Sequence, residues 1–401
     1  MINRALMTGF MSVGCAVEDL QVMPIPVVRH AVHHGGEAGG IHVRRSPFDP
    51  KVVDILFFDG DGRDLPPGKT QSIERLFTRE DFPRAGPDGT GDLNFPTRVI
   101  DRYHQDFLNH VDRESIAEKR FNIVIDFAYG TTVNVLPGIL GALNADVVSL
   151  DAYAAPGRLS RTDDEFRGGL GRLGGIVRSI GAHLGVWIDP GGEVIHLVDD
   201  TGRPMSADVM QLLLVDLAFQ HLGVRRVALP VTTSAALAER VRAQGGEVAW
   251  SKTEHHAMMA SATDVDMVAG TRGEFIFSRF LPAYDGMFAI VKLLEALALA
   301  DRPLSAIADG YAPIFKSQER VSCPWGRKGA VMRQLMESTE GSERQLVDGV
   351  KIWEATHAWT LVIPHSDKPY FVVTAEGPDR ETADALVGDY TARVERWRDD
   401  A

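Results

Sequence analysis

The chain has 401 residues, 44% apolar and 24% charged, a composition typical of a globular protein with roughly two to four domains. Lys and Arg number 42 against 55 Asp and Glu, for a net charge of −13. This acidic balance argues against nucleic acid as the main partner, because phosphate backbones are bound by clustered cations. No apolar run reaches the roughly 18 residues of a membrane span. Two cysteines cannot form a disulfide framework, so we expect a cytoplasmic protein.

The N-terminal segment allows two interpretations. Residues 1–17 contain an early Arg4, an apolar middle and SVGC at 12–15, which loosely resembles a lipoprotein cleavage site. However, Ser12 stands where such sites prefer a large aliphatic residue, and Glu18 and Asp19 follow closely. We therefore favour an amphipathic helix that ends near Gly14 and leads into a strand at 16–22.

Two polar clusters can be considered as metal sites. DGDGRD at 59–64 alternates carboxylates with glycine, but Thr70 stands where a calcium EF-hand needs a bidentate Glu. A polar turn that ends a strand at 55–58 is the simpler interpretation. His30, His33 and His34 can share a helix face, but no carboxylate is close to them in the sequence to complete a metal site.

The segment 39–58 presents a serine beside two arginines. A glycine pair and an apolar strand lead to Arg44, Arg45, Ser46 and Pro47, followed by a turn and a second strand. Two guanidinium groups beside Ser46 suit a serine that meets phosphate. From these residues alone, this interpretation and an ordinary surface turn are equally supported.

Strand–helix–strand units recur along the middle of the chain. Residues 121–127 predict a buried parallel strand, followed by a helix over 135–143 and a strand at 146–150. A second unit has strands at 227–230 and 247–250 around a helix from Ser234 to Gln244, with Ser234 as its N-cap. Residues 5–22 fit a third copy that lacks its first strand. Separate units predict repeated α/β domains rather than one large sheet.

The C-terminal part has a different pattern. Strands are predicted at 359–363 and 370–374 around a polar loop, and a helix at 381–397 closes a small α+β unit. The Pro- and Gly-rich residues 83–96 and the charged residues 112–120 are predicted linkers.

The order of these segments resembles the α-D-phosphohexomutases, the superfamily of phosphomannomutase and phosphoglucomutase. The resemblance covers essentially the whole chain and implies an α/β fold of three related α/β domains and a small C-terminal α+β domain. It places domain I at 1–118, domain II at 119–224, domain III at 225–314 and domain IV at 315–401. Members transfer phosphate between C1 and C6 of a hexose through a phosphoserine, with magnesium. Their first strands would lie before Met1, so we expect domain I to be N-terminally truncated and the chain to be a fragment.

The resemblance also assigns the first two loops. The phosphoserine loop, TASHNP in the family, is RRSPFD at 44–49, which makes Ser46 and Arg45 catalytic and Arg44 phosphate-binding. The magnesium loop, DGDGDR in the family, is DPGGE at 189–193. Asp189 and Glu193 are therefore the implied metal ligands, with Gly191 in place of the middle carboxylate. Two carboxylates make a poorer Mg²⁺ site than three. The similar DGDGRD at 59–64 falls in the wrong domain.

The two remaining loops have also lost family residues. The sugar loop, GExSGH in the family, is GTRGE at 270–274, which leaves Arg272 and Glu274 as the implied sugar-binding residues. The phosphate loop, RPSGTEP in the family, is IPHSDKP at 363–369 and lacks the arginine. The resemblance leaves His365, Ser366 and Lys368 as the implied phosphate-binding residues of this loop.

The scaffold thus matches the family better than the reacting groups do. We predict a phosphomannomutase/phosphoglucomutase-like protein that binds a hexose phosphate or nucleotide sugar without efficient turnover, because its loops lack groups that stabilise a transferring phosphoryl group. The RSPFDP stretch resembles the mutase-like domain fused to mannose-1-phosphate guanylyltransferases, which implies a role in GDP-mannose metabolism and a guanylyltransferase domain or chain as partner. Two alternatives stay open: an active mutase that works through Ser46 with Mg²⁺, and a purely structural module.

Overall fold

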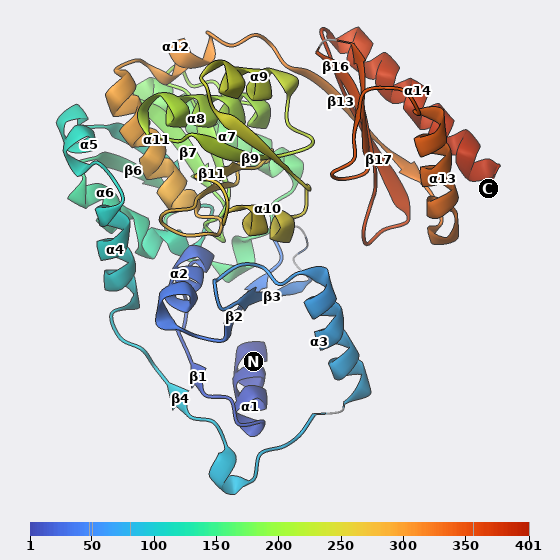
Figure 1. Cartoon of the computed structure of the whole chain (residues 1–401). Helices are drawn as coiled ribbons and strands as arrows, with labels where there is room; N and C mark the ends of the chain where they lie inside the picture. Colours follow the sequence, from blue (N-terminus) through green and yellow to red (C-terminus); the bar gives the residue numbers. More distant parts are fainter. Residues whose placement is uncertain (48, 50, 81, 356, 401) are drawn as a thin grey trace.

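The computed structural model describes residues 1–47, 49, 51–80, 82–355 and 357–400. Phe48, within the predicted serine loop, and Pro50, directly after it, lie outside the described residues. Figure 1 shows the N-terminal elements below the two α/β units, with the C-terminal sheet to one side. Among the helices described, none has both the length and the apolar character needed to cross a membrane.

The N-terminal region holds two separate pairs of strands. Its elements are α1 (Ile2–Ser12), β1 (Val17–Glu18), α2 (Ile25–Gly35), β2 (Gly39–Arg45), β3 (Val53–Asp59), α3 (Pro67–Arg79), η1 (Pro87–Gly89) and β4 (Leu93–Asn94). β1 pairs with β4 in parallel, and β2 pairs with β3 in antiparallel. The predicted helix leading into a strand is confirmed, although the strand is much shorter than 16–22. Residues 83–96, predicted as a linker, supply β4.

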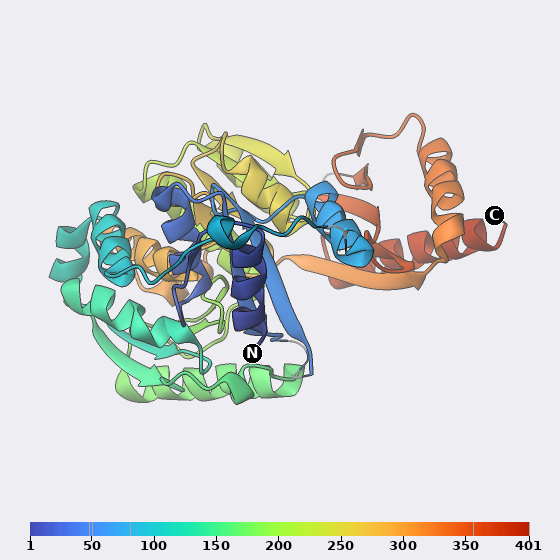
Figure 2. The same ribbon diagram turned by 90° about the horizontal axis from the view of Figure 1, so that it is seen from below.

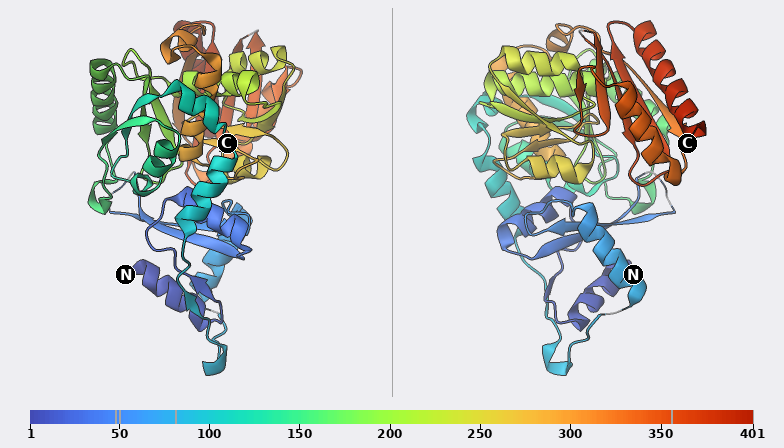
Figure 3. Two further views of the ribbon diagram at one scale, coloured as in Figure 1. Left: turned by 90° about the vertical axis from the view of Figure 1, so that its left-hand side faces the viewer. Right: turned by 45° about the vertical axis from the view of Figure 1, so that its right-hand side comes forward.

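A cavity of about 1050 Å³ opens between the N-terminal region and the unit that follows it in the chain. Apolar side chains of α1, β2 and β3 line much of it, among them Leu6, Phe10, Ile41, Val43 and Phe57. Figure 3 shows the N-terminal region projecting below the rest of the molecule. Residues 129–131, 154–156 and 190–191 of the second unit also line the cavity, which therefore lies where the two regions meet.

The next unit is a four-stranded sheet with helices around it. It comprises α4 (Val99–Asn109), α5 (Arg113–Lys119), β5 (Asn122–Asp126), η2 (Thr131–Asn134), α6 (Leu136–Ala142), β6 (Asp146–Leu150), η3 (Pro156–Arg158), α7 (Asp163–Ile180), β7 (Leu184–Ile188) and β8 (Ile195–Val198). The strand order is β6-β5-β7-β8, and β8 alone among these strands is antiparallel to its neighbour. The predicted strand at 146–150 is confirmed.

The prediction of a linker over 112–120 is wrong. This segment is α5, capped by the Asp112 side chain, which accepts a hydrogen bond from the backbone N–H of Ser115. Ile116 is fully buried against the main core. One apolar anchor and one cap are enough for a short helix that packs on a neighbour.

The third unit repeats the plan of the second. It comprises α8 (Ala207–His221), β9 (Arg226–Pro230), α9 (Ala235–Ala243), β10 (Glu247–Ser251), α10 (His255–Ser261), β11 (Met267–Ala269), β12 (Phe275–Phe277), α11 (Gly286–Ala300) and α12 (Leu304–Ala308). The strand order is β10-β9-β11-β12, again with an antiparallel last strand. Ser234 caps α9 as predicted. The repeated order confirms the prediction of related α/β units.

The C-terminal unit is an antiparallel sheet covered by two helices. It comprises β13 (Phe315–Ser322), α13 (Trp325–Ser338), β14 (Arg344–Gln345), β15 (Val350–Ala355), β16 (Ala358–Pro364), β17 (Tyr370–Gly377) and α14 (Arg380–Asp399), with strand order β13-β17-β16-β15-β14. Figure 2 shows it beside the α/β units, with which it makes polar contacts. Lys351 donates to the Val231 carbonyl at 2.8 Å, and Ser234 donates to Glu376 at 2.8 Å. The predicted α+β unit is confirmed.

Candidate functional site

Loops from the three α/β units meet around the turn between β7 and β8. The backbone N–H of Ile25, at the start of α2, donates to the Gly191 carbonyl at 3.1 Å, and Gly286, at the start of α11, donates to the Gly192 carbonyl at 2.8 Å. The loop at 270–274 joins from the third unit, because Val194 and Glu274 form an isolated β-bridge. We call residues 25–29, 59–64, 189–194 and 270–274 the central loop cluster.

A buried arginine connects this cluster to the N-terminal region. Arg29 of α2 is 1% exposed. Its Nη2 lies 2.7 Å from Asp64 Oδ1 and 2.8 Å from Glu193 Oε1, and its Nη1 donates to the Gly62 carbonyl at 2.8 Å. Burial raises the pKa of Glu193, and the Arg29 charge opposes that rise. Sequence reasoning missed Arg29 and set the 59–64 segment aside, although a charged residue inside the apolar run IPVVRHAV was a signal.

Asp189, the first implied metal ligand, holds its own loop together. Its carboxylate accepts backbone N–H groups from Gly191 at 2.9 Å, Glu193 at 2.6 Å and Val194 at 2.8 Å. Mg²⁺ needs oxygen ligands in near-octahedral geometry. With Asp189 engaged by the backbone and Glu193 by Arg29, this donor set does not fit a Mg²⁺ site.

Arg44 faces the same loop. A β-carbon built on Gly191 would lie 2.7 Å from Arg44 Nη1 and 2.9 Å from Asp189 Oδ2. Arg44 also pairs with Asp54 on the neighbouring strand, Nε to Oδ2 at 3.4 Å. A guanidinium group therefore stands where the family motif has its middle carboxylate, and positive charge of this kind suits an anion rather than a metal ion.

Ser46 lies at the end of β2 against the second unit. Its side chain is buried, its N–H donates to the Val52 carbonyl at 3.0 Å, and its carbonyl accepts the Ser160 hydroxyl at 2.6 Å. Arg45 beside it is exposed and, with Arg44, borders the cavity of the N-terminal region. The structure thus brings together the predicted serine, its two arginines and the predicted metal loop.

The predicted sugar-binding carboxylate is engaged within its own loop. Glu274 is 2% exposed and accepts the Arg272 N–H at 2.7 Å and Arg272 Nε at 3.0 Å. His255 Nε2 lies 3.5 Å from the same carboxylate. Burial would raise the pKa of Glu274, but the hydrogen bond to His255 and the charge of Arg272 outweigh it and lower the pKa to about 2. Arg272, which also contacts His255, keeps its side chain largely exposed.

The predicted phosphate loop belongs to the C-terminal unit. Lys328 of α13 donates to the carbonyls of His365 and Lys368, both at 2.6 Å. The Ser366 hydroxyl donates to Asp367 at 3.1 Å. Ser366 and Lys368 are exposed. Among the residues that the structure describes, this loop does not line the cavity of the N-terminal region.

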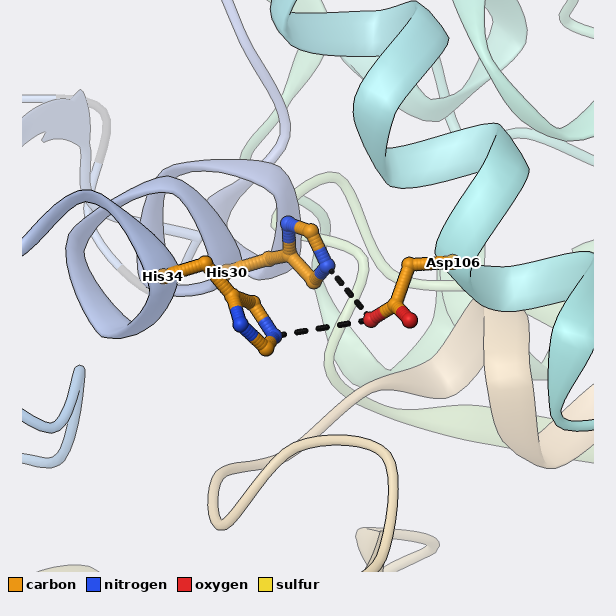
Figure 4. Close-up of side chains that lie close together, drawn as sticks. All are labelled: His30, His34 and Asp106. Atoms are coloured by element: carbon orange, nitrogen blue, oxygen red, sulfur yellow. Dashed lines mark hydrogen bonds and ion pairs between the residues drawn. The ribbon is translucent and has the colours of Figure 1, made fainter.

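The expectation that His30 and His34 have no carboxylate nearby is wrong. Asp106 of α4 lies against α2, with its Oδ2 2.9 Å from His30 Nε2 and 3.4 Å from His34 Nε2 (Figure 4). A separation of 72 residues or more along the chain hid this contact from sequence spacing.

Sequence patterns of the phosphoglucomutase/phosphomannomutase alpha/beta/alpha domains match residues 1–84 for domain I, 101–202 for domain II and 206–314 for domain III. A phosphoglucomutase/phosphomannomutase of Thermococcus kodakarensis is 26% identical over 389 residues, covering 96% of this chain and 84% of that protein. A probable phosphoglucosamine mutase of Pyrococcus furiosus is 25% identical over 396 residues, covering 96% and 85%.

Solved structures share the fold. A phosphoglucomutase/phosphomannomutase family protein from Burkholderia thailandensis superposes with a TM-score of 0.84 at 19% identity, covering 99% of this chain and 86% of that one. Aspergillus fumigatus N-acetylphosphoglucosamine mutase, solved with GlcNAc-6P and magnesium, superposes with a TM-score of 0.63 at 10% identity, covering 98% and 93%.

Proposed function

Because the chain belongs to the phosphoglucomutase/phosphomannomutase family, we propose that it binds a hexose phosphate at the central loop cluster and does not turn it over efficiently. The observation that carries this proposal is the position of Arg44, whose Nη1 lies 2.7 Å from the place of a β-carbon at residue 191. A guanidinium group can hold a phosphate by two parallel hydrogen bonds without a metal ion.

Efficient phosphoryl transfer requires the site to stabilise a transition state, which binding of the ligand alone does not. The transferring phosphoryl group spreads negative charge over its oxygens, and enzymes stabilise it with metal ions and fixed cations. Here Asp189 is held by three backbone N–H groups and Glu193 by Arg29. These contacts support a site that retains an anion but stabilises the transition state poorly.

The class of ligand is supported by the relatives. The Aspergillus fumigatus mutase was solved with GlcNAc-6P, and a variant of it with glucose 1,6-bisphosphate. Both ligands are hexose phosphates. We extend this class to the present chain, with Arg44, Arg45 and the exposed Arg272 and Lys368 as its cationic contacts.

A second candidate is an active mutase. Ser46 is retained at the end of β2, and it lies beside both arginines. In this case phospho-Ser46 would give its phosphoryl group to a hydroxyl of the bound sugar phosphate, and the resulting bisphosphate would return the other phosphoryl group to the serine.

Binding and turnover can be separated with the purified full chain. Titration calorimetry with glucose 6-phosphate and mannose 1-phosphate, in EDTA and in Mg²⁺, should give binding that does not depend on the metal and that Arg44→Ala weakens. A coupled mutase assay with glucose 1,6-bisphosphate should show little turnover. Absence of binding heat for both sugars would overturn the proposal. Turnover that Ser46→Ala abolishes would establish the second candidate.

The link to GDP-mannose and a guanylyltransferase partner rests on the RSPFDP resemblance and stays a prediction. It would be supported if adding the chain changed the rate of a mannose-1-phosphate guanylyltransferase and alanine at Arg45, Arg272 and Lys368 removed that effect. An effect that survives all three alanine substitutions would favour the purely structural module.

A further inference from the structure

Two histidines and an aspartate converge at the contact between α2 and α4. His30 and His34 are four residues apart on α2 and therefore project from one face of the helix. Asp106 reaches them from α4, and Figure 4 shows both rings turned toward its carboxylate. One ring nitrogen of each histidine and one carboxylate oxygen all lie within 4.8 Å of one another.

These distances suit a tetrahedral metal ion. Zn²⁺ binds imidazole nitrogen and carboxylate oxygen at about 2.0–2.2 Å, so neighbouring ligand atoms in a tetrahedron stand roughly 3.3–3.5 Å apart. Asp106 Oδ2 is 2.9 Å from His30 Nε2 and 3.4 Å from His34 Nε2.

The two histidines of this triad differ in their exposure to solvent. The His30 side chain is almost fully buried and packs edge-on against Tyr103 at 5.3 Å between ring centroids. The His34 side chain is 49% exposed, so solvent reaches the site there. The Tyr103 hydroxyl in turn donates to Asp285 at 2.6 Å. A rigid buried ligand and an accessible edge are what a metal ion needs in order to enter and be held.

We propose that His30, His34 and Asp106 form a zinc site with water in the fourth position, which clamps α2 of the N-terminal region to α4. Zn²⁺ binds imidazole nitrogen and carboxylate oxygen together, whereas Mg²⁺ and Ca²⁺ prefer oxygen alone. The site uses no residue of the central loop cluster, and the ion would join the two helices.

The test uses the full chain after removal of metal with EDTA. Titration with Zn²⁺ should reach saturation at one ion per chain and raise the melting temperature. Co²⁺ should give the strong visible absorption of a tetrahedral complex. His34→Ala and Asp106→Asn should each lower the Zn²⁺ affinity by more than about 100-fold, since even outer-shell partners of a metal ligand contribute about 10–100-fold.

His33→Ala is the matched control, because His33 is the neighbour of His34 on the same helix but lies outside the triad. It should bind Zn²⁺ like the unchanged chain. His30 is buried, so its substitution is avoided because misfolding would confuse the result. Absence of stoichiometric Zn²⁺ binding, binding that survives both His34→Ala and Asp106→Asn, or loss of binding in His33→Ala would overturn the proposal.

Discussion

Arg29 and Glu193, 164 positions apart in the chain, form an ion pair at the centre of the molecule, with Nη2 2.8 Å from Oε1. Arg29 belongs to the N-terminal region and Glu193 to the loop between β7 and β8. The pair therefore joins two α/β units at the loop that the family uses for its metal ion. A carboxylate that was implied as a metal ligand serves here as the partner of a buried cation.

Replacing Arg29 by methionine should destabilise the protein strongly. The substitution leaves the buried Glu193 carboxylate without its cation, which costs about 3–5 kcal/mol. Urea denaturation of Arg29→Met against the unchanged chain measures the loss in the free energy of unfolding. The double variant Arg29→Met/Glu193→Gln removes both charges and should recover part of that loss. A double variant no more stable than Arg29→Met would show that the burial of Glu193 is not the cause.

Restoring the missing carboxylate should not by itself create a metal site. In Gly191→Asp the new side chain begins 2.7 Å from Arg44 Nη1, so we expect it to form an ion pair with the guanidinium group. Calorimetric titration with Mg²⁺ should show no gain in binding. Adding Arg44→Ser removes the competing cation, and Mg²⁺ binding should then appear but stay weak, because Glu193 remains paired with Arg29. Equal Mg²⁺ affinity in the single and double variants would contradict this explanation.

The Glu274 carboxylate should make stability depend on pH. Its pKa is lowered to about 2 in the folded protein from an ordinary value of 4.5. A lowered pKa contributes stability above pH 4.5 that is lost as the pH falls toward 2, and the full difference corresponds to about 3 kcal/mol. The free energy of unfolding of the unchanged chain minus that of Glu274→Gln should therefore shrink between pH 5 and pH 3.

Glu247→Gln provides the control for this experiment, because Glu247 is also on the third unit but has a largely exposed side chain. Its effect on the free energy of unfolding should stay small and nearly constant over the same pH range. A constant difference for Glu274→Gln would mean that its carboxylate is not stabilised in the ionised form.

The repeated α/β units could be predicted because the central strands β5 and β9 are short, nearly continuous apolar runs that are buried in their sheets. Asp146–Leu150 was located to the residue. The helix Arg113–Lys119 could not be predicted, because only Ile116 among its residues is buried and the other residues are mostly charged, as in a linker. Likewise β1 has only two residues, since a strand's length depends on its partner as well as on its own sequence.

The site was predictable in its parts but not in its contacts. Motif order placed Ser46 and Asp189 on loops that the structure brings into one region. The contacts themselves depend on the path of the folded loops. The Asp189 carboxylate accepts backbone N–H groups, and Arg44 lies against Gly191. Asp106 meets His30 only because α2 packs on α4.

Replacing Lys328 by methionine should loosen the predicted phosphate loop. Lys328 donates to the His365 and Lys368 carbonyls, and hydrogen bonds from a charged donor contribute about 1.5–3 kcal/mol each. We expect a lower free energy of unfolding and several-fold weaker binding of glucose 6-phosphate. Arg327→Met on the same helix is the control and should leave sugar-phosphate binding unchanged. Unaltered binding in Lys328→Met would remove this loop from the ligand site.

Helix α2 carries Arg29 and His30 side by side, and successive residues on a helix point about 100° apart. One side chain is tied to the central ion pair and the next to α4. The helix therefore cannot roll about its own axis without breaking one of the two attachments. A ligand that changes either attachment therefore acts on the helix that carries the other, and α2 links the two sites.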